Sequence, residues 1–247
     1  TTNDVCSLGV CAGDDSACVC EPNFSLVVNK FNGIQMGPNG EPGSGLDVDE
    51  NPETCAPENS CSGGIDNALS ALASFANDAL AESILNGDVI MLLEHDGYNE
   101  DGIPFTTYFH IGESAEATCD INGNTCPYWV EGSGYDEACV PVVVLPGMKV
   151  DNGLLTGGGK GTQLPIVLPL SESALLALTL YDVQISAEVT TVNGSVTLQG
   201  VLGGAVKETD LVSAIEALPE GSFPGGLSSE VVISLLSSLV VSDIDIN

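Results

Sequence analysis

The balance of ionisable side chains is the feature that most restricts how this chain can fold. Thirty-five aspartate and glutamate residues stand against four lysines, Lys30, Lys149, Lys160 and Lys207, and no arginine, so the 247 residues carry a formal net charge of −31. Self-repulsion of this size destabilises a compact state unless cations lie close to the carboxylates. We therefore expect either specifically bound divalent ions or an acidic coat that salt screens.

The same charge restricts the partners of the chain. Proteins bind phosphate backbones and anionic headgroups through lysine and arginine, so a surface this acidic excludes nucleic acid and direct headgroup binding. A membrane-spanning helix needs a run of about 18 apolar residues. The most apolar stretch, residues 230–241, is shorter than that and contains serines, so we expect no membrane span.

The cysteines indicate an oxidising compartment. All nine lie in the first 139 residues: Cys6, Cys11, Cys18, Cys20, Cys55, Cys61, Cys119, Cys126 and Cys139. They form no Cys-x-x-Cys pair, and the chain has only two histidines, so the pattern favours disulfides over zinc sites. We expect an extracellular or outer-surface location. Because the number of cysteines is odd, one thiol is free, paired between chains, or separated from its partner. The sequence starts at Thr1 rather than Met, which favours a removed leader or a longer natural chain.

Two regions are expected along the chain. Residues 1–22 are cysteine-rich and polar, and we interpret them as a disulfide-stapled N-terminal arm. Residues 23–247 form a single α+β domain that is mainly β with flanking helices, and its core is a β-sandwich or an open barrel. Strands are predicted at residues 25–31, 88–94, 104–111, 140–145, 148–150, 163–170, 175–189 and 195–202.

Punctuating residues refine this outline. Pro165 and Pro169 cannot donate to a β-ladder, so they mark an edge strand or a bulge. Apolar residues at helical spacing from Ile65 to Ile84 predict an amphipathic helix, with capping side chains at residues 62–66 and a stop at Asn86-Gly87. Two further helices, at residues 207–218 and 227–241, are expected to close the domain.

Asparagine–glycine pairs predict tight hairpins. Asn122-Gly123 is centred between Cys119 and Cys126, so we predict a 119–126 disulfide across that turn. On the chain-entropy model a loop this short stabilises the fold by ~2.5 kcal/mol. Asn152-Gly153 and Asn193-Gly194 predict two more turns.

An acidic segment has the spacing of a calcium loop. Asp47, Asp49, Asn51 and Glu58 occupy its first, third, fifth and twelfth positions, and Glu53 adds a further carboxylate. Proline at the sixth position argues against an EF-hand turn. We therefore predict a calcium site between Asp47 and Asp66, with Asp66 among its ligands.

The last residues repeat the start of such a loop. Asp243, Asp245 and Asn247 occupy alternating positions, which either opens a second calcium site or forms an acidic tail without a ligand. The sequence stops before the positions that decide between these alternatives.

Catalytic patterns are missing from the sequence. It has no Gly-x-Ser-x-Gly elbow. If residues 88–95 pair with residues 104–111, His95 meets Pro104 and His110 meets Val89, so each histidine is an isolated, half-buried strand residue. The glycine-rich run at residues 157–161 lacks the phosphate-loop spacing and is interpreted as a flexible turn.

Three segments resemble a family of uncharacterised secreted or lipoprotein-like proteins from myxobacteria and related bacteria. They are Gly64-Ile-Asp-Asn-Ala-Leu69, Leu145-Pro-Gly-Met-Lys-Val-Asp-Asn-Gly-Leu-Leu155 and Gly200-Val-Leu-Gly-Gly-Ala-Val-Lys207. The likeness extends over roughly residues 24–247. It implies an exported, envelope-associated protein in which an aspartate-rich loop follows near the end, and it implies no particular activity.

Together these patterns favour a non-enzymatic structural protein that is secreted or lies on the cell surface. Disulfides and calcium are expected to stabilise it, and an unpaired cysteine and exposed β-edges suit self-assembly or contacts with other envelope proteins. The alternative is an extracellular module that binds a ligand in an apolar pocket. A cation-dependent hydrolase is a third, less favoured reading.

Overall fold

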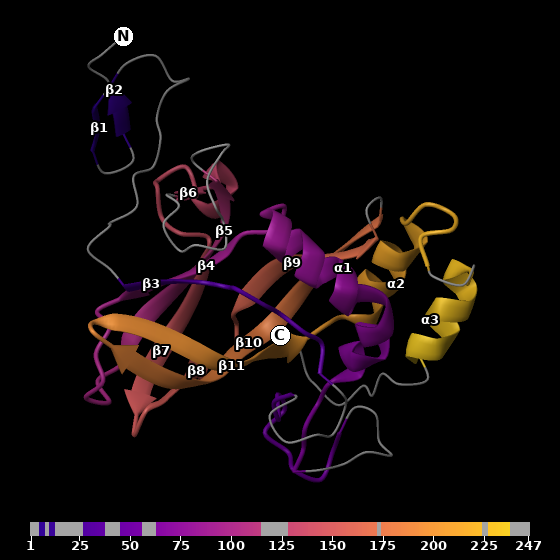
Figure 1. Cartoon of the computed structure of the whole chain (residues 1–247), viewed down its shortest axis with the longest axis horizontal. Helices are drawn as coiled ribbons and strands as arrows, with labels where there is room; N and C mark the ends of the chain where they lie inside the picture. Colours follow the sequence, from indigo (N-terminus) through magenta and orange to yellow (C-terminus); the bar gives the residue numbers. More distant parts are fainter. Residues whose placement is uncertain are drawn as a thin grey trace.

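A computed structural model describes residues 5–7, 10–12, 27–37, 45–55, 63–114, 128–171, 174–223 and 227–237. The largest element of the described chain is one antiparallel nine-stranded sheet (Figure 1). Its strands are β3 (Val27–Lys30), β4 (Met91–Asp96), β5 (Phe105–Ser114), β6 (Tyr128–Val130), β7 (Val143–Asp151), β8 (Leu154–Gly158), β9 (Gln163–Ser171), β10 (Ala174–Val192) and β11 (Ser195–Ala205). The prediction of a mainly β fold with flanking helices is confirmed.

The sheet curls until its two ends approach each other. Its main path runs β11-β10-β8-β7-β5-β4-β3, so β3 and β11 are the terminal strands. The side-chain amide of Asn29 in β3 nevertheless donates to the carbonyl of Val196 in β11 at 2.7 Å. The architecture is therefore an open barrel, and we call the line between β3 and β11 the seam.

Buried apolar side chains fill the barrel. Leu145, Met148, Val150, Leu155 and Val183 are fully buried there, with neighbours from β4, β5, β9 and β10. Alternate residues of β7 point inward, as the period of two in a strand requires. This interior is a packed core.

Strand β10 holds the two halves of the domain together. Its first part, up to Tyr181, pairs with β9, whereas its second part, from Gln184, pairs with β8 and β11. Between them Asp182 has a φ of 52°, and the β11 register shifts there. In the part of the chain that is described, β9 pairs only with β10, so the edge strand predicted from Pro165 and Pro169 is confirmed.

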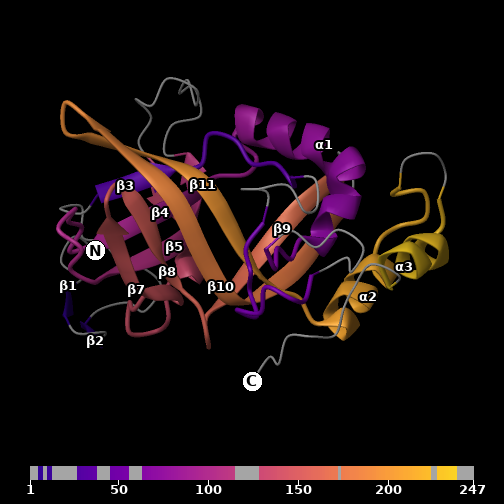
Figure 2. The ribbon, with the colours of Figure 1, turned by 90° about the horizontal axis from the view of Figure 1, so that it is seen from below.

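Three helices cover the β9 end of the sheet (Figure 2). They are α1 (Ala73–Asn86), α2 (Glu208–Glu216) and α3 (Ser229–Ser237). Their apolar faces form a second core with the first half of β10, in which Ala76 of α1, Ile215 of α2 and Val232 of α3 are buried. The three predicted helices are therefore present, and residues 238–241 of the last one lie outside the described chain.

Two local predictions need correction. The first helical turns, Ala68–Leu72, are a 3-10 segment, and Asn67 rather than a residue in 62–66 caps it by accepting from the amide of Ser70. The strands predicted at residues 140–145 and 148–150 are one strand, β7, with a bulge opposite Thr106 where the β5 register shifts. The predicted end of α1 is confirmed, because Gly87 adopts the left-handed C-cap conformation.

The N-terminal segment forms a separate two-stranded sheet. Strands β1 (Val5–Ser7) and β2 (Val10–Ala12) pair antiparallel, with Cys6 opposite Cys11. The division into an arm at 1–22 and a domain at 23–247, and the disulfides of the arm, remain predictions.

Candidate metal site

The acidic loop and the segment before the first helix meet through a β-bridge. Leu46 pairs with Asp66, and the amide of Asp66 donates to the carbonyl of Leu46 at 2.9 Å. The amide of Val48 in turn donates to the Asp66 carboxylate at 3.3 Å. This pairing brings Asp66 beside two aspartates that precede it by almost twenty positions.

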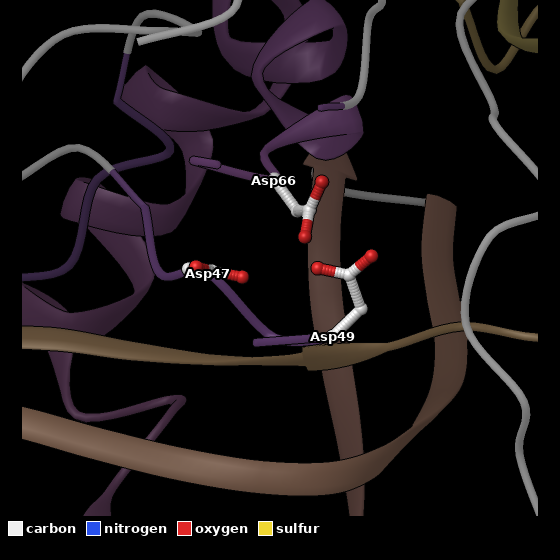
Figure 3. Close-up of side chains that lie close together, drawn as sticks. All are labelled: Asp47, Asp49 and Asp66. Carbon is white, nitrogen blue, oxygen red and sulfur yellow. The ribbon is translucent and has the colours of Figure 1, made fainter. Parts of the chain in front are cut away.

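Asp47, Asp49 and Asp66 point their carboxylates into one common space (Figure 3). One oxygen from each lies within 4.8 Å of the others, and all three side chains are half-buried. Of the predicted ligands in the described chain, these three are the ones that the fold gathers.

Local hydrogen bonds fix two of these carboxylates. The amide of Asn51 donates to Oδ1 of Asp47 at 2.8 Å and to Oδ1 of Asp49 at 2.9 Å. The hydroxyl of Thr54 donates to Oδ2 of Asp49 at 2.6 Å. The loop therefore presents its acidic oxygens in a defined geometry.

The two carboxylates of the loop differ in proton affinity. Burial, together with the neighbouring Asp49, raises the pKa of Asp47. Burial also acts to raise the pKa of Asp49, but hydrogen bonds from Thr54, from the Asn51 amide and from Asp47 outweigh it and lower that pKa. The site thus raises the pKa of Asp47 and lowers that of Asp49, and a bound cation would favour the ionised form of both carboxylates.

The donor set suits a hard cation. Three carboxylates are oxygen ligands of the kind that Ca²⁺ and Mg²⁺ prefer, whereas zinc and copper favour imidazole and thiolate. Neither histidine belongs to this cluster. A calcium ion would take Asp47, Asp49 and Asp66 as its carboxylate ligands.

The remaining predicted ligands are placed differently. Asn51 is exposed, and its side-chain oxygen accepts from the amide of Glu53 at 3.2 Å, so it contributes to the loop through its backbone amide. Glu53 is exposed. Glu58, Asp243, Asp245 and Asn247 lie outside the described residues. Leu46, directly before Asp47, lies in the isolated bridge to Asp66, and the absence of an EF-hand remains a prediction because residues 38–44 lie outside the described chain.

Two cysteines of the described chain are disulfide-bonded. Cys55, which ends the acidic loop and is 1% exposed, is disulfide-bonded, and so is Cys139. The other cysteines, including the predicted 119–126 pair and its Asn122-Gly123 turn, lie outside the described side chains.

The two histidines correct the predicted hairpin register. His95 lies opposite Thr107 and His110 opposite Leu92, three residues away from the predicted pairing. They are not half-buried, since their exposed fractions are 0% and 1%, and they lie on opposite faces of the sheet. A three-residue shift follows from the loop between the strands, where the Asn99 side chain accepts from the amides of Asp101 and Ile103.

His110 forms a buried pair that the sequence did not indicate. Its Nε2 lies 2.9 Å from Oε2 of Glu94, and the two side chains are 1% and 7% exposed. Within the described chain, Nδ1 of His110 and the hydroxyl of Tyr135 have no hydrogen-bond partner, and the two rings lie 5.4 Å apart. Burial, with a smaller contribution from the charge of Glu94, raises the pKa of Tyr135 to about 12.

A surface groove of about 620 Å³ adjoins the metal site. Asp49 and Glu50 line one side, and residues 156–160 with Asp182 line the other. Gly157 and Gly158 belong to strand β8 and are closely packed, so only the end of the run forms a turn, where the amide of Gly159 donates to the carbonyl of Val183. A second groove, of about 480 Å³, lies between the start of β7 and β9. Both grooves are open to solvent.

Comparisons with protein-family models, curated proteins and solved structures found no match. In the described residues, every helix is too short or too polar to cross a membrane.

Proposed function

We propose that this protein is an exported, non-enzymatic structural module whose fold is stabilised by disulfides and by calcium bound at Asp47, Asp49 and Asp66. The observation that carries the proposal is the convergence of three carboxylates within 4.8 Å in a chain of net charge −31. Gathering like charges costs free energy, and a divalent ion offsets that cost. The buried, disulfide-bonded Cys55 at the end of the same loop supports a location in an oxidising compartment.

The partner in this proposal is another envelope protein or a second copy of the chain. Pro165 and Pro169 lie on the open edge of β9, and proline weakens pairing between strand edges. We therefore do not assign assembly to that edge. The packed barrel interior gives less support to the alternative of a module with an enclosed apolar pocket.

Calcium should raise thermal stability through these three residues. At a free concentration one hundred times the Kd, binding to the folded state stabilises it by about 2.7 kcal/mol. For a domain of this size that corresponds to about 5–10 °C in Tm. Calorimetry with and without EDTA, under non-reducing conditions, measures the shift, and native mass spectrometry counts the ions.

A charge-matched control separates specific binding from screening. The triple variant Asp47→Asn, Asp49→Asn, Asp66→Asn should lose the calcium-dependent shift. Glu137→Gln, Glu188→Gln and Glu208→Gln remove the same charge from exposed positions and should keep it. An equal calcium response in both triple variants would mean that calcium acts only as screening salt.

A glycine next to the site provides a sharper test. A Cβ added to Gly64 would lie 2.8 Å from Oδ2 of Asp47 and 2.7 Å from Cα of Pro52, so Gly64→Ala should displace the ligand. We expect calcium affinity to fall about 10-fold or more, as it does when groups that position a ligand are changed. Gly63→Ala is the control, because Gly63 also has a positive φ but has open space around its Cβ position. Calorimetric titration compares the two variants, and equal affinities would contradict the assigned role of Asp47.

A further inference from the structure

A series of three hydrogen bonds, buried at His95 and partly buried at Asn29, crosses the seam of the barrel. Nδ1 of His95 lies 2.7 Å from the hydroxyl of Thr107, and its Nε2 lies 3.1 Å from Oδ1 of Asn29. The amide nitrogen of Asn29 then donates to the carbonyl of Val196 at 2.7 Å. His95, which is fully buried inside the barrel, thereby holds the side chain that joins β3 to β11.

These contacts determine the tautomer of His95. The amide nitrogen of Asn29 is used on Val196, so the oxygen of Asn29 faces the ring and can only accept. Nε2 of His95 must therefore carry the hydrogen, and in the neutral ring Nδ1 accepts from Thr107. The neutral Nε2–H tautomer therefore gives a donor and an acceptor to each hydrogen bond between Thr107, His95, Asn29 and Val196.

A second contact holds the residue of β10 that lies opposite Val196 in the β10–β11 hairpin. The hydroxyl of Thr191 donates to Oε1 of Glu100 at 2.6 Å, and Thr191 is the direct cross-strand partner of Val196. Tyr98 also donates to Oε1 of Glu100, and its ring lies 5.9 Å from that of His95. Both members of the cross-strand pair Thr191–Val196 are therefore hydrogen-bonded to the rest of the barrel, Val196 to Asn29 and Thr191 to Glu100.

The hairpin beyond the barrel has an unusual composition for this protein. Residues 189–206 contain no charged side chain, although the chain as a whole carries −31. The part near the turn, residues 190–195, is exposed, whereas Val189 and Leu198 pack partly against the barrel core. We call residues 189–200 the ribbon.

The groups around His95 are mainly uncharged. Asn29 reaches it from β3, Thr107 and the ring of Phe105 from β5, and the phenol of Tyr98, backed by Glu100, from the β4–β5 loop. The acidic neighbours in β4 face the other side of the sheet, where Glu94 pairs with His110 and Asp96 lies near Tyr108. Among the described residues no carboxylate contacts the ring, so a proton on His95 would place a charge in a buried site without a counter-ion.

We propose that the ribbon is an acid-released flap, with His95 as the residue that keeps the seam closed while its ring is neutral. Acid favours the open form because protonated His95 is better solvated there. Opening separates Asn29 from Val196 and exposes the inner face of the ribbon, including Val189 and Leu198. The device acts independently of the metal site.

Burial sets the pH range of this release. It lowers the pKa of His95 from 6.5 to about 4 in the closed form, whereas an opened, solvated ring regains its ordinary pKa. The open form then binds more protons between pH 6.5 and pH 4, so opening becomes more favourable as pH falls through this window. From pH 7 to pH 5 the opening equilibrium should rise about 20-fold.

Hydrogen exchange of the Asn29 side-chain amide measures the opening, because that group donates across the seam. NMR at pH 7 and pH 5, in calcium-saturated buffer and with correction for intrinsic exchange, should show protection falling about 20-fold in the wild-type chain. In His95→Gln the fall should shrink to less than about threefold, because glutamine does not titrate. An unchanged wild-type protection, or a full pH response in His95→Gln, would overturn the proposal.

Two further variants keep the test decisive. His110→Gln removes the other buried histidine and should retain the wild-type pH response. Thr191→Val removes the hydrogen bond to Glu100 and should lower the protection of the Asn29 side-chain amide by the same factor at both pH values. A pH response that is lost in His110→Gln but kept in His95→Gln would show that His110, on the outer face of the sheet, controls the opening. That result would refute the role proposed for His95.

Discussion

Glu94→Ala should lower the free energy of unfolding by about 3–5 kcal/mol, because it breaks a buried pair and leaves its partner behind. The Glu94 carboxylate contacts Nε2 of His110 at 2.9 Å on a face that Tyr135 covers. Nδ1 of His110 already has no hydrogen-bond partner among the described residues. The variant would leave both ring nitrogens unsatisfied, and each such buried group costs about 1–3 kcal/mol.

Two controls test whether the pair itself is responsible. Glu188→Ala removes a glutamate from an exposed strand position and should change stability by no more than about 0.5 kcal/mol. The double variant Glu94→Leu, His110→Phe should be more stable than Glu94→Ala, since it removes both polar partners and leaves no buried charge. Urea unfolding in calcium, under non-reducing conditions, compares all four proteins. A loss below about 1 kcal/mol in Glu94→Ala would show that water reaches the pair.

This pair also shows why part of the structure could not be predicted from the sequence. The strands and their hairpin were expected, but the register was misplaced by three residues because the Asn99 side chain closes the loop between them. The register determines which residues lie opposite each other and which face of the sheet each side chain occupies. The misplaced register therefore predicted two isolated, half-buried histidines. Only the folded chain places Glu94 beside His110.

Turns that depend on local backbone chemistry were predictable. Asn152-Gly153 and Asn193-Gly194 both form two-residue hairpin turns with positive φ at each position, as the sequence indicated. The end of α1 at Gly87 has the same kind of local cause. By contrast, the seam depends on contacts between β3 and β11, which are far apart in the sequence, and no local pattern indicates it.

The candidate site lies between these two cases. Alternating aspartates predicted a cation near Asp47 and Asp49, and Asp66 was included in the same interval. The bridge between Leu46 and Asp66 is a tertiary contact that selects Asp66 as their neighbour. Spacing alone also nominated Asn51, whose side-chain oxygen instead accepts from a backbone amide of the loop. Ligand type was therefore predictable from the sequence, and ligand geometry was not.

Gly158→Ala should destabilise the protein by about 2–5 kcal/mol, because two costs coincide at this position. Its φ of 87° lies in the left-handed region, which costs an L-residue about 1–2 kcal/mol. A Cβ would also lie 2.2 Å from the carbonyl oxygen of Val183, a backbone atom beside the bend of β10. Relieving such an overlap in a packed sheet costs about 1–3 kcal/mol more.

Gly161→Ala isolates the first of these costs, so its comparison with Gly158→Ala gives the second. Gly161 has a φ of 84°, close to that of Gly158, but a Cβ there meets no atom within 4 Å. Its substitution should cost only the backbone part, about 1–2 kcal/mol. The difference between the two variants in urea unfolding therefore measures how tightly the end of β8 is packed against β10. Equal losses would mean that the sheet can separate at this point, and the bend of β10 would then not be fixed by the approach of β8.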